Sequence, residues 1–476
     1  MYTPFGLYWN GMWQKPASGK SIPVISPVTE EVLGEAPAAN KSDTRKVVES
    51  AVSGTAQWRK VISLERSRML RRVAEVMRER TDEMARWLSL ELGKPLDQSK
   101  GEVSMAIEQF EWYAEEAKRI YGHILESREP HGKVLIQHEP LGVVAAFTSW
   151  NFPVVLAARK IAPALAAGCS VILLPAEEAP GSAMSLVQCL HEAGVPAGVI
   201  NLINGSADTI SPVLLNESRV RKISLTGSAR VGKLLIKASA ETLKRTSMEL
   251  GGHAPVIIYA DADAEAIAEQ AALVKFKHCG QVCASPSRYF IHESQAEAFT
   301  NKFIEITQNF KLGNGMESGV DIGPLATKKR LKEVELMVSG TLKSGARLRL
   351  GGKRPERFDR GFFYEPTVFD QVPDHAPIMQ EEPFGPLVPI TTFRYFDEVI
   401  ERANSLEYGL TSYAFTRSQR LAHDTADALE AGMVAVNTFA LASAETPYGG
   451  IKQSGFGREG GSQGIHDYLN IKYINM

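Results

Sequence analysis

The sequence has few of the residues that build a cross-linked or metal-bound protein. Only four of its 476 residues are cysteines, and they stand at Cys169, Cys189, Cys279 and Cys283. They are too few and too unevenly placed for a disulfide framework. Cys279 and Cys283 are close together, but His278 is the only histidine beside them and no second ligand pair follows. We therefore expect neither structural disulfides nor a metal site.

Long hydrophobic runs are also missing. No apolar stretch reaches the roughly 18 to 20 residues that a membrane-spanning helix needs, and the longest, residues 161–174, contains Pro163 and Gly168. Residues 1–15 have no basic start followed by an apolar core, so we expect no signal peptide. The sequence therefore predicts a cytoplasmic protein without a membrane partner.

The chain also lacks a large excess of charge of either sign. The formal net charge is -2, with 23% charged and 44% hydrophobic residues, which is ordinary for a globular protein. Neither nucleic acid nor an anionic membrane surface is therefore indicated as a partner. A length of 476 residues predicts two to three domains with ample core.

What the chain does contain is a series of apolar strands that alternate with helices. In the first series we expect strands at 143–147, 170–174, 199–203 and 221–225, and helices at 154–167, 182–193 and from about 230. In a second region, 254–437, we expect strands at 255–259 and 288–292 and helices at 263–277 and 295–310. Such patterns predict parallel sheets covered by helices, which bind ligands at the carboxyl ends of their strands.

The flanking regions have weaker patterns. Residues 6–39 indicate short strands and turns, and 59–121 is predicted to be largely helical, with a helix from about residue 65 that stops at Gly93-Lys94-Pro95. Residues 133–138 and 468–476 are strand candidates. As exposed sheet edges they would be covered by a second subunit, which predicts a homodimer or homotetramer.

Two residues could carry out covalent chemistry. Glu249 precedes the pair Gly251-Gly252, and Cys283 follows a Gly-Gln turn. A thiolate is a nucleophile, and a carboxylate can be general base to a thiol or to water. Paired glycines let a backbone or a planar ligand approach closely. Each residue alone also fits a simpler interpretation, a small buried side chain for the thiol and a solvated surface group for the carboxylate.

Two loops at the ends of predicted strands add candidate ligand contacts. Thr226-Gly227-Ser228 precedes a helix, where amides and a hydroxyl suit a phosphate, although an ordinary helix cap is the alternative. Its spacing matches neither the three-glycine dinucleotide fingerprint nor a Walker loop. The amide of Asn151 could donate to a developing oxyanion, and a turn asparagine before a proline is the other interpretation.

Taken together, these segments resemble the NAD(P)-dependent aldehyde dehydrogenase superfamily over essentially the whole chain. The resemblance rests on Trp150-Asn151-Phe152-Pro153, Thr226-Gly227-Ser228 with Gly232, Glu249-Leu250-Gly251-Gly252, Gly280-Gln281-Val282-Cys283, Glu382-Pro383-Phe384-Gly385-Pro386, Asn437, and Pro447 to Gly455. It implies an α/β fold with a Rossmann-like cofactor domain (1–121 and 141–252), an α/β catalytic domain (253–453) and a small β oligomerisation arm (122–140 and 454–476).

The resemblance also implies catalytic roles. Cys283 would attack the aldehyde carbon, and the Asn151 amide with the Cys283 backbone N–H would hold the oxyanion. Loss of hydride to the nicotinamide then leaves a thioester. Glu249 would activate the water that hydrolyses it, and Lys160 and Glu459 match a proton relay behind Glu249.

The cofactor contacts follow in the same way. Ser228 and neighbouring amides would contact the pyrophosphate, Glu382 the hydroxyls of the nicotinamide ribose, and Phe384 the nicotinamide. The set is completed by Thr148, Trp150, Gly227 and Leu250.

The adenine-ribose site departs from the family. Leu174 stands where the family usually has a lysine that bonds the ribose and helps to bind a 2′-phosphate. Glu177 remains, and it can accept from both ribose hydroxyls but would repel a 2′-phosphate. Without a compensating cation this favours NAD, and NADP stays an alternative if another lysine or arginine reaches the site.

The substrate prediction rests on Arg159, Arg288 and Ser443, a set similar to that of succinate-semialdehyde dehydrogenases. Guanidinium groups bind carboxylates bidentately, so we expect a short aldehyde with a carboxylate at its far end, such as succinate semialdehyde. Residues 245–255 and 457–461 also resemble that group and the 2-oxoglutarate-semialdehyde enzymes. Arg288 is the less selective arginine, because members outside the group carry it too.

Two further residues complete the comparison with that group. Its members sometimes have a second cysteine just after the nucleophile, but Ser285 stands there, so we predict no redox disulfide. Cys279 matches no catalytic position and is expected to pack in the core.

Other functions stay open within the resemblance. An aromatic or medium- to long-chain aldehyde would fit if Phe439 and Tyr448 lined the channel. A non-catalytic, structural member of the fold is the alternative from another class, although Cys283, Glu249 and Asn151 are all present. Glu249 argues against a phosphorylating or CoA-acylating enzyme, which would not need a residue that activates water.

Overall fold

The first sheet has eight strands in the order β2-β1-β9-β8-β7-β10-β11-β21. The computed structural model describes residues 4–476, so the first three residues of the predicted cofactor domain and of the segment tested for a signal peptide lie outside it. The parallel centre consists of β9 (Ile200–Leu202), β8 (Ser170–Leu174), β7 (Val143–Phe147), β10 (Val220–Thr226) and β11 (Arg245–Glu249). Antiparallel edges are formed by β1 (Leu7–Trp9), β2 (Met12–Gln14) and β21 (Gly455–Phe456).

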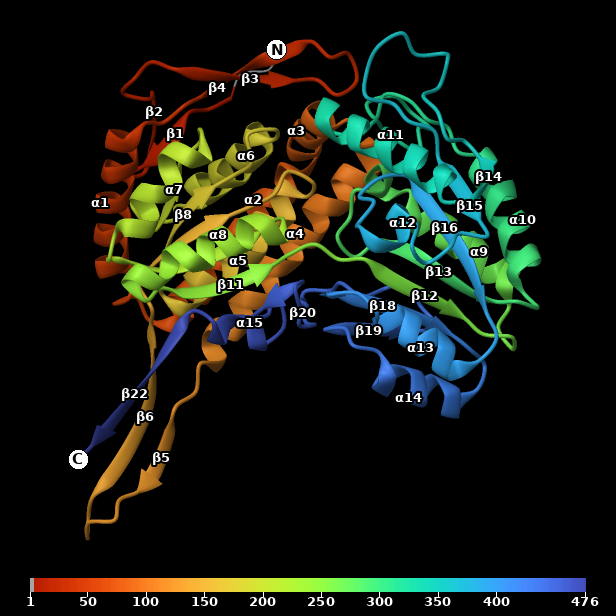
Figure 1. The fold of residues 1–476 in the computed structure, drawn as a ribbon. Coiled ribbons are helices and arrows are strands. Elements are labelled where there is room, and N and C mark those ends of the chain that lie inside the picture. Colours follow the sequence, from red (N-terminus) through yellow and green to blue (C-terminus); the bar gives the residue numbers. More distant parts are fainter. Residues whose placement is uncertain (1–3) are drawn as a thin grey trace.

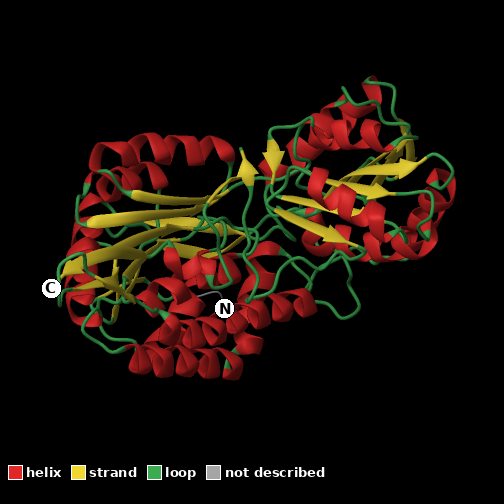
Figure 2. Cartoon of the chain, turned by 90° about the horizontal axis from the view of Figure 1, so that it is seen from below, coloured by secondary structure: helices red, strands yellow, loops and turns green. Residues whose placement is uncertain are grey.

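Helices cover both faces of this sheet (Figure 2). Because successive strand residues point to opposite faces, Val144 and Ala146 of β7 join one core and Val143 and Ala145 join the other. The first core includes α2 (Ser63–Glu79), α3 (Thr81–Leu92), α4 (Leu96–Glu116), α5 (Pro153–Ala167) and α6 (Pro180–Glu192). The second includes α1 (Lys41–Trp58), α7 (Ala207–Asn216) and α8 (Ala229–Ser239).

The second sheet has seven strands in the order β14-β15-β16-β13-β12-β18-β19. These are β14 (Arg347–Leu350), β15 (Thr367–Asp370), β16 (Leu387–Phe393), β13 (Pro286–His292), β12 (Ala254–Ile258), β18 (Thr411–Phe415) and β19 (Met433–Val436), all parallel except β14. The accompanying helices are α9 (Ala264–Lys275), α10 (Ala296–Gln308), α11 (Lys328–Lys343), α12 (Pro377–Gln380), α13 (Phe396–Asn404) and α14 (Gln419–Ala428). The two sheets lie side by side, with loops between them (Figure 2).

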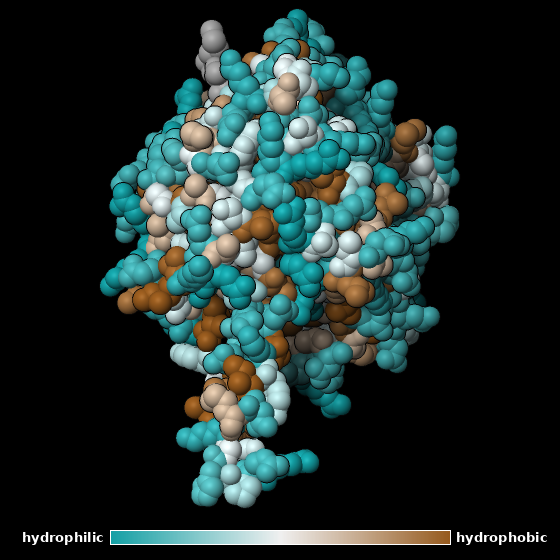
Figure 3. Space-filling model, turned by 90° about the vertical axis from the view of Figure 1, so that its left-hand side faces the viewer, coloured by the Kyte–Doolittle hydropathy of each residue, from teal (hydrophilic) through white to brown (hydrophobic). Residues whose placement is uncertain are grey.

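A three-stranded antiparallel arm projects from the body (Figure 1). It consists of β5 (His123–Glu126), β6 (Lys133–Pro140) and β22 (Leu469–Asn475) in the order β22-β6-β5. Apolar atoms gather where the arm leaves the body, and its tip is hydrophilic (Figure 3). Exposed apolar side chains on the arm strands are Ile124, Leu125, Ile471 and Tyr473.

The small elements complete the chain. Two pairs of strands form separate ladders, β3 (Ser21–Ile25) with β4 (Val32–Pro37), and β17 (Tyr408–Gly409) with β20 (Ile451–Lys452). Helix α15 (Gln463–His466) lies against α5, before β22. Within residues 4–476, no helix is both long and apolar enough to cross a membrane.

Three differences from the sequence expectations have local causes. The helix expected to run from residue 65 to Gly93 is two helices, because Arg80 leaves the helical conformation (φ -103°, ψ 13°). Helix α1 was not predicted, although Asn40 and Asp43 form a capping box at its start. The segment 454–476, assigned to the arm, begins instead with β21 in the first sheet, because Phe456 pairs with Met248.

Candidate active site

A cavity of about 400 Å³ lies where the carboxyl ends of β7, β10 and β11 face the second sheet. From the first half of the fold it is lined by Ser149, Trp150, Asn151, Glu178, Thr226, Gly227, Ser228, Arg230, Glu249, Leu250 and Gly251. From the second half it is lined by Cys283, Thr327, Lys329, Arg330, Glu333, Glu382 and Phe384. Most residues predicted for catalysis and cofactor binding are therefore brought together in one place.

The loop that carries Cys283 has a strained backbone. His278 and Cys279 adopt positive φ angles of 47° and 55°, which non-glycine residues rarely take and which often occur at functional sites. The side chain of Gln281 ties the loop down, because it donates to the His278 carbonyl (3.0 Å) and accepts from the Ala326 amide (2.9 Å). Cys279 is buried in the second core, which confirms the prediction that it packs.

The thiol of Cys283 contacts a tyrosine. Its Sγ lies 3.1 Å from the phenol oxygen of Tyr448, and Tyr413 donates to the next carbonyl, that of Ala284 (2.7 Å). Burial raises the pKa of Cys283 well above its usual value, and the nearby charge of Glu249 acts in the same direction, whereas the Tyr448 hydrogen bond lowers it. The resting form is therefore a thiol, which needs a proton acceptor before it can attack.

Glu249 is positioned to be that acceptor. It is the last residue of β11 and is buried, and neither carboxylate oxygen has a hydrogen-bond partner among residues 4–476. Burial raises its pKa to about 7, and the charge of Glu459 adds to this, while Lys160 and Arg159 oppose it. A carboxyl group with a pKa near neutrality is well suited to general-base catalysis.

Lys160 and Glu459 form a buried ion pair behind Glu249. The Lys160 ammonium also donates to Oγ1 of Thr226 (2.7 Å). The main chains of Glu459 and Tyr448 exchange two hydrogen bonds of 2.7 and 2.8 Å. This pairing keeps Glu459 close to Tyr448, and the charge of Glu459 acts on Glu249.

Asn151 is oriented from both ends of its amide. Its Nδ2 donates to the Gln281 carbonyl (3.1 Å) in the nucleophile loop, and its Oδ1 accepts from Ser149 Oγ (2.7 Å). The amide N–H groups therefore face the loop that carries Cys283. This is the direction that an oxyanion donor requires.

A buried ion pair that was not predicted supports Asn151. Lys94 pairs with Glu102 and donates to the Asn151 carbonyl (3.0 Å). Glu102 accepts from the amides of Val154 (2.9 Å) and Val155 (3.3 Å), in the first turn of α5. The available signal was the helical spacing of α4, which places the Glu102 carboxylate on the same buried side as Val103 and Ala106.

Of the predicted substrate residues, Arg159 lies beside the site and does not itself line the cavity. It is buried on α5, its guanidinium carbon lies 4.2 Å from the ring centre of Tyr448, and its Nε has no hydrogen-bond partner in the described part of the chain. Ser443 does not line the cavity; it is half-buried, and its Oγ bonds Thr446 Oγ1 (3.1 Å).

The prediction that Arg288 binds substrate is wrong. Its guanidinium is buried and donates to the main-chain carbonyls of His253 (3.0 Å), Arg402 (3.3 Å) and Ala403 (2.8 Å). These bonds join β13 to the end of α13. With three of its donors used in this way, Arg288 has a structural role.

The remaining cavity residues fit a dinucleotide. Ser228 caps α8, where amides suit a pyrophosphate. The half-buried Glu382 accepts from the Gly252 amide (3.2 Å), and desolvation raises its pKa to about 8. A Cβ on Gly251 would lie 2.6 Å from a Glu382 oxygen, so a larger residue there would displace this carboxylate. Trp150 and Phe384 meet edge to face, with ring centres 5.5 Å apart. An aromatic wall and a carboxyl acceptor suit a nicotinamide riboside.

The part of the site that was predicted to bind the adenine ribose differs in part from the sequence expectation. Leu174 is buried, and its carbonyl accepts from the amide of Thr148 (3.2 Å). Glu177 is exposed and does not line the cavity, whereas Glu178 does, and burial raises its pKa. Sequence reasoning also missed the cations that line the cavity, which are Arg230, Lys329 and Arg330.

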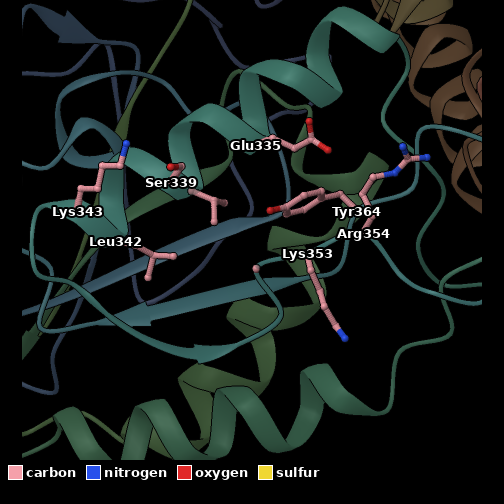
Figure 4. Close-up of a pocket in the computed structure, with 9 residues that line it drawn as sticks. Glu335, Ser339, Leu342, Lys343, Lys353, Arg354 and Tyr364 are labelled. Carbon is pink, nitrogen blue, oxygen red and sulfur yellow. The ribbon is translucent and has the colours of Figure 1, made fainter.

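A second cavity, of about 420 Å³, lies between α11 and the segment after β14 (Figure 4). Charged side chains, including Glu335, Lys343, Lys353 and Arg354, surround Tyr364 there. Its lining contains no thiol and no residue predicted for catalysis. The chemistry is therefore assigned to the first cavity.

Comparisons with known proteins agree with this geometry. Residues 13–474 match the model of the aldehyde dehydrogenase family. The chain is 42% identical over 467 residues to a glutarate-semialdehyde dehydrogenase of Pseudomonas putida, covering 98% of this chain and 96% of the relative. It is 40% identical over 465 residues to an Escherichia coli succinate-semialdehyde dehydrogenase [NADP(+)], covering 98% and 96%. A crystal structure of succinate-semialdehyde dehydrogenase from Burkholderia pseudomallei superposes with a TM-score of 0.97 at 40% identity, covering 99% and 97%. The chain therefore belongs to the aldehyde dehydrogenase family, whose members are NAD(P)-dependent oxidoreductases.

Proposed function

We propose that the enzyme oxidises a short aldehyde that carries a carboxylate at its far end. The observation that supports this is the buried guanidinium of Arg159, which lies over Tyr448 while the same tyrosine contacts the Cys283 thiol. An aldehyde group at Cys283 would place a carboxylate a few bonds away within reach of the arginine. The relatives named for succinate and glutarate semialdehydes support the same class of substrate.

Acylation begins with the loss of the thiol proton. Glu249 takes the proton from Cys283, and the thiolate forms a C–S bond to the aldehyde carbon as the carbonyl electrons move to oxygen. The amide of Asn151 and the backbone N–H of Cys283 donate to this oxyanion. When bound, NAD(P)+ supplies the acceptor for the hydride that leaves this carbon. The oxyanion electrons re-form the C=O bond, and a thioester remains on Cys283.

Deacylation uses the same carboxylate again. Glu249 removes a proton from water, the resulting hydroxide adds to the thioester carbon, and the C–S bond breaks to release the acid and the Cys283 thiolate. For this cycle the carboxylate must lose its proton between the two steps. The buried pair Lys160–Glu459 lies on the side where that proton would leave.

We propose NAD as the preferred cofactor. Leu174 offers no donor to a 2′-phosphate, and Glu178 brings a carboxyl group to the cavity. Arg230 and Lys329 line the same cavity and are the cations that could compensate. The ratio of kcat/KM for the two cofactors decides the question, and a strong preference for NADP would contradict the proposal.

We also propose that the arm joins subunits into a homodimer or homotetramer. Exposed apolar side chains on β5 and β22, such as Ile124 and Ile471, support an interface there. Light scattering at micromolar concentration tests this, and a monomeric mass would contradict it.

The substrate proposal is tested with Arg159→Ala. The variant should lose about tenfold to a hundredfold in kcat/KM for succinate semialdehyde, the scale expected when a charge-assisted hydrogen bond is lost. Propanal, which has no carboxylate, should be affected much less. Equal losses for the two aldehydes would refute a role in carboxylate recognition.

A further inference from the structure

Two neighbouring strands in the first sheet carry polar side chains at matching positions. The parallel register of β10 and β11 places three polar pairs opposite each other, namely Lys222 with Arg245, Ser224 with Ser247, and Thr226 with Glu249. Alternate residues of a strand share a face, so these pairs form a column on one face, which ends at the catalytic carboxylate. Central strands of parallel sheets are normally apolar throughout, so a buried polar column needs an explanation.

Hydrogen bonds join the column to the ion pair behind Glu249. Lys160 donates to Thr226 Oγ1 (2.7 Å) and pairs with Glu459. One step further along, Ser247 Oγ donates to Ser224 Oγ (3.2 Å). The Lys222 ammonium lies 4.9 Å from the ring centre of Tyr468, which covers this part of the column. The polar groups therefore continue beyond the predicted relay.

Several atoms along this line are buried without a hydrogen-bond partner in the described part of the chain. They are Nζ of Lys222, Oε2 of Glu459, Oδ2 of Asp467 and both carboxylate oxygens of Glu249. Buried polar groups of this kind are normally satisfied by ordered water. Waters that join these atoms would make the column continuous.

Lys222 has the properties of a proton carrier. It is buried in the middle of the fold, and burial lowers its pKa to about 8. The charges that face it are Asp467 and Glu459, which raise its pKa, and Lys160 and Arg245, which lower it. It can therefore exist as the amine or as the ammonium ion near neutral pH.

The far end of the column reaches the surface. Arg245 is exposed, and its guanidinium donates to the Leu469 carbonyl (2.7 Å), at the first residue of the arm strand β22. Asp467 is partly exposed and lies just before that strand. A proton that reached Lys222 would therefore be close to solvent at the base of the arm.

The chemistry requires such a route. Conversion of RCHO, NAD(P)+ and H₂O into RCOO⁻ and NAD(P)H releases two protons in a buried site. Glu249 takes up one from the thiol and one from water in each turnover, and the proton left on the acid product returns to the Cys283 thiolate. We propose that Lys222, Ser224 and Asp467 extend the relay of Glu459 and Lys160 and carry these protons from Glu249 to solvent at the base of the arm. Only O–H and N–H bonds form and break along the path: Glu249 returns to the carboxylate, the Lys222 amine gains a proton, and the ammonium ion releases it toward Asp467 and water. The inference rests on the proposed role of Glu249 as base.

The test separates proton removal from acylation. Lys222→Met keeps the length of the side chain but cannot carry a proton, and Ser224→Ala interrupts the column with a smaller change. When each variant is mixed with aldehyde and NAD+, we expect a full pre-steady-state burst of NADH followed by turnover slowed on the order of tenfold. The solvent deuterium isotope effect on turnover should rise, and small diffusible buffer bases should restore part of the rate.

Lys244→Met is the matched control. Lys244 stands just before β11, burial lowers its pKa to about 8, and it donates to the Val220 carbonyl (2.8 Å) at the start of β10, outside the column. We expect its burst, turnover and isotope effect to match those of the unmodified enzyme. If the burst and turnover of Lys222→Met and Ser224→Ala fell in parallel, or if neither variant changed turnover or isotope effect, the proton route would be wrong.

Glu249→Gln distinguishes this inference from the function on which it rests. It should keep little or no deacylation. Normal deacylation by Glu249→Gln would overturn the role of the base and the route with it. Loss of deacylation in Glu249→Gln together with unchanged Lys222→Met would overturn the route alone.

Discussion

The phenol oxygen of Tyr448 lies 3.1 Å from Sγ of Cys283, and the same ring carries the Arg159 guanidinium on its face at 4.2 Å. One side chain therefore contacts both the nucleophile and the proposed anchor for the substrate carboxylate. Tyr448 is held there by its main-chain bonds to Glu459, a member of the buried ion pair behind the base. A substitution of Tyr448 should therefore act first on the Cys283 thiol.

Tyr448→Phe should raise the pKa of Cys283. The Tyr448 hydrogen bond lowers that pKa in the folded enzyme, and a net hydrogen bond of about 1 kcal/mol corresponds to a little under one pH unit. The rate of alkylation by iodoacetamide should therefore rise at a pH higher by about that amount. Tyr259→Phe is the control, since its hydroxyl bonds Thr425 in the second core. An unchanged alkylation profile for Tyr448→Phe would contradict the contact.

Lys94→Met should impair both stability and catalysis. The substitution leaves Glu102 buried without its cation, which costs about 3 to 5 kcal/mol of unfolding free energy, and it removes the donor to the Asn151 carbonyl. We expect a lower Tm and a lower kcat for acylation, measured by thermal unfolding and by the NADH burst.

An exposed ion pair supplies the control for Lys94. Lys100 pairs with Asp82 at the surface, so Lys100→Met should change stability by no more than about 1 kcal/mol. A Lys94→Met enzyme with normal burst kinetics would show that Asn151 does not depend on this support.

Much of the site could be predicted because its parts are local in sequence. Ser228 and Asn151 lie in loops that follow predicted strands, and Glu249 is the last residue of β11, so parallel strands bring all three to one edge. The strands at 143–147 and 170–174 were predicted to the residue, because apart from Ser170 they are apolar and they are bounded by turn residues. The sequence prediction and the structure therefore agree where the prediction depends on neighbouring residues in the sequence.

What could not be predicted depends on contacts between distant segments. Arg288 follows Cys283 closely, yet its guanidinium bonds carbonyls near the end of α13, which no local pattern reveals. Lys94 and Glu102 were likewise hidden, since their partners Asn151 and Val154 lie in another part of the chain. The cations Lys329 and Arg230 enter the cavity from separate halves of the fold for the same reason.

Leu174→Lys should shift cofactor preference toward NADP. A cation at the end of β8 could bond the ribose and attract a 2′-phosphate, which Leu174 cannot do. We expect the ratio of kcat/KM for NADP to that for NAD to rise about tenfold, as one charge-assisted hydrogen bond allows. Leu174→Met controls for the loss of packing, because Leu174 is buried in the core. An unchanged ratio would place the 2′-hydroxyl away from this position.

The rate of deacylation should rise with pH through about 7. Glu249 acts as a base only as the carboxylate, and its pKa is about 7 in the folded enzyme, so protonation below that pH removes the base. In Glu459→Gln the rise in rate should occur at lower pH, because the charge of Glu459 raises the pKa of Glu249. The measurement is the pH profile of kcat under conditions where deacylation limits turnover. If the rate rose at the same pH in Glu459→Gln as in the unmodified enzyme, the two carboxylates would not interact.

Gly280→Ala should displace the nucleophile loop. Gly280 has a φ of 75°, and a Cβ there would lie 2.2 Å from the Gly385 carbonyl oxygen. Because a backbone atom cannot move aside as the end of a side chain can, the turn before Cys283 must shift away from the loop that carries Glu382. We expect kcat/KM to fall by about a hundredfold, the scale of a 1 Å misplacement of a catalytic group. Gly194→Ala is the control, because it introduces the same kind of backbone strain without the clash. Gly194 has a φ of 86°, and no atom lies within 4 Å of the added Cβ. Similar activity in the two variants would mean that the contact between Gly280 and Gly385 does not position the thiol.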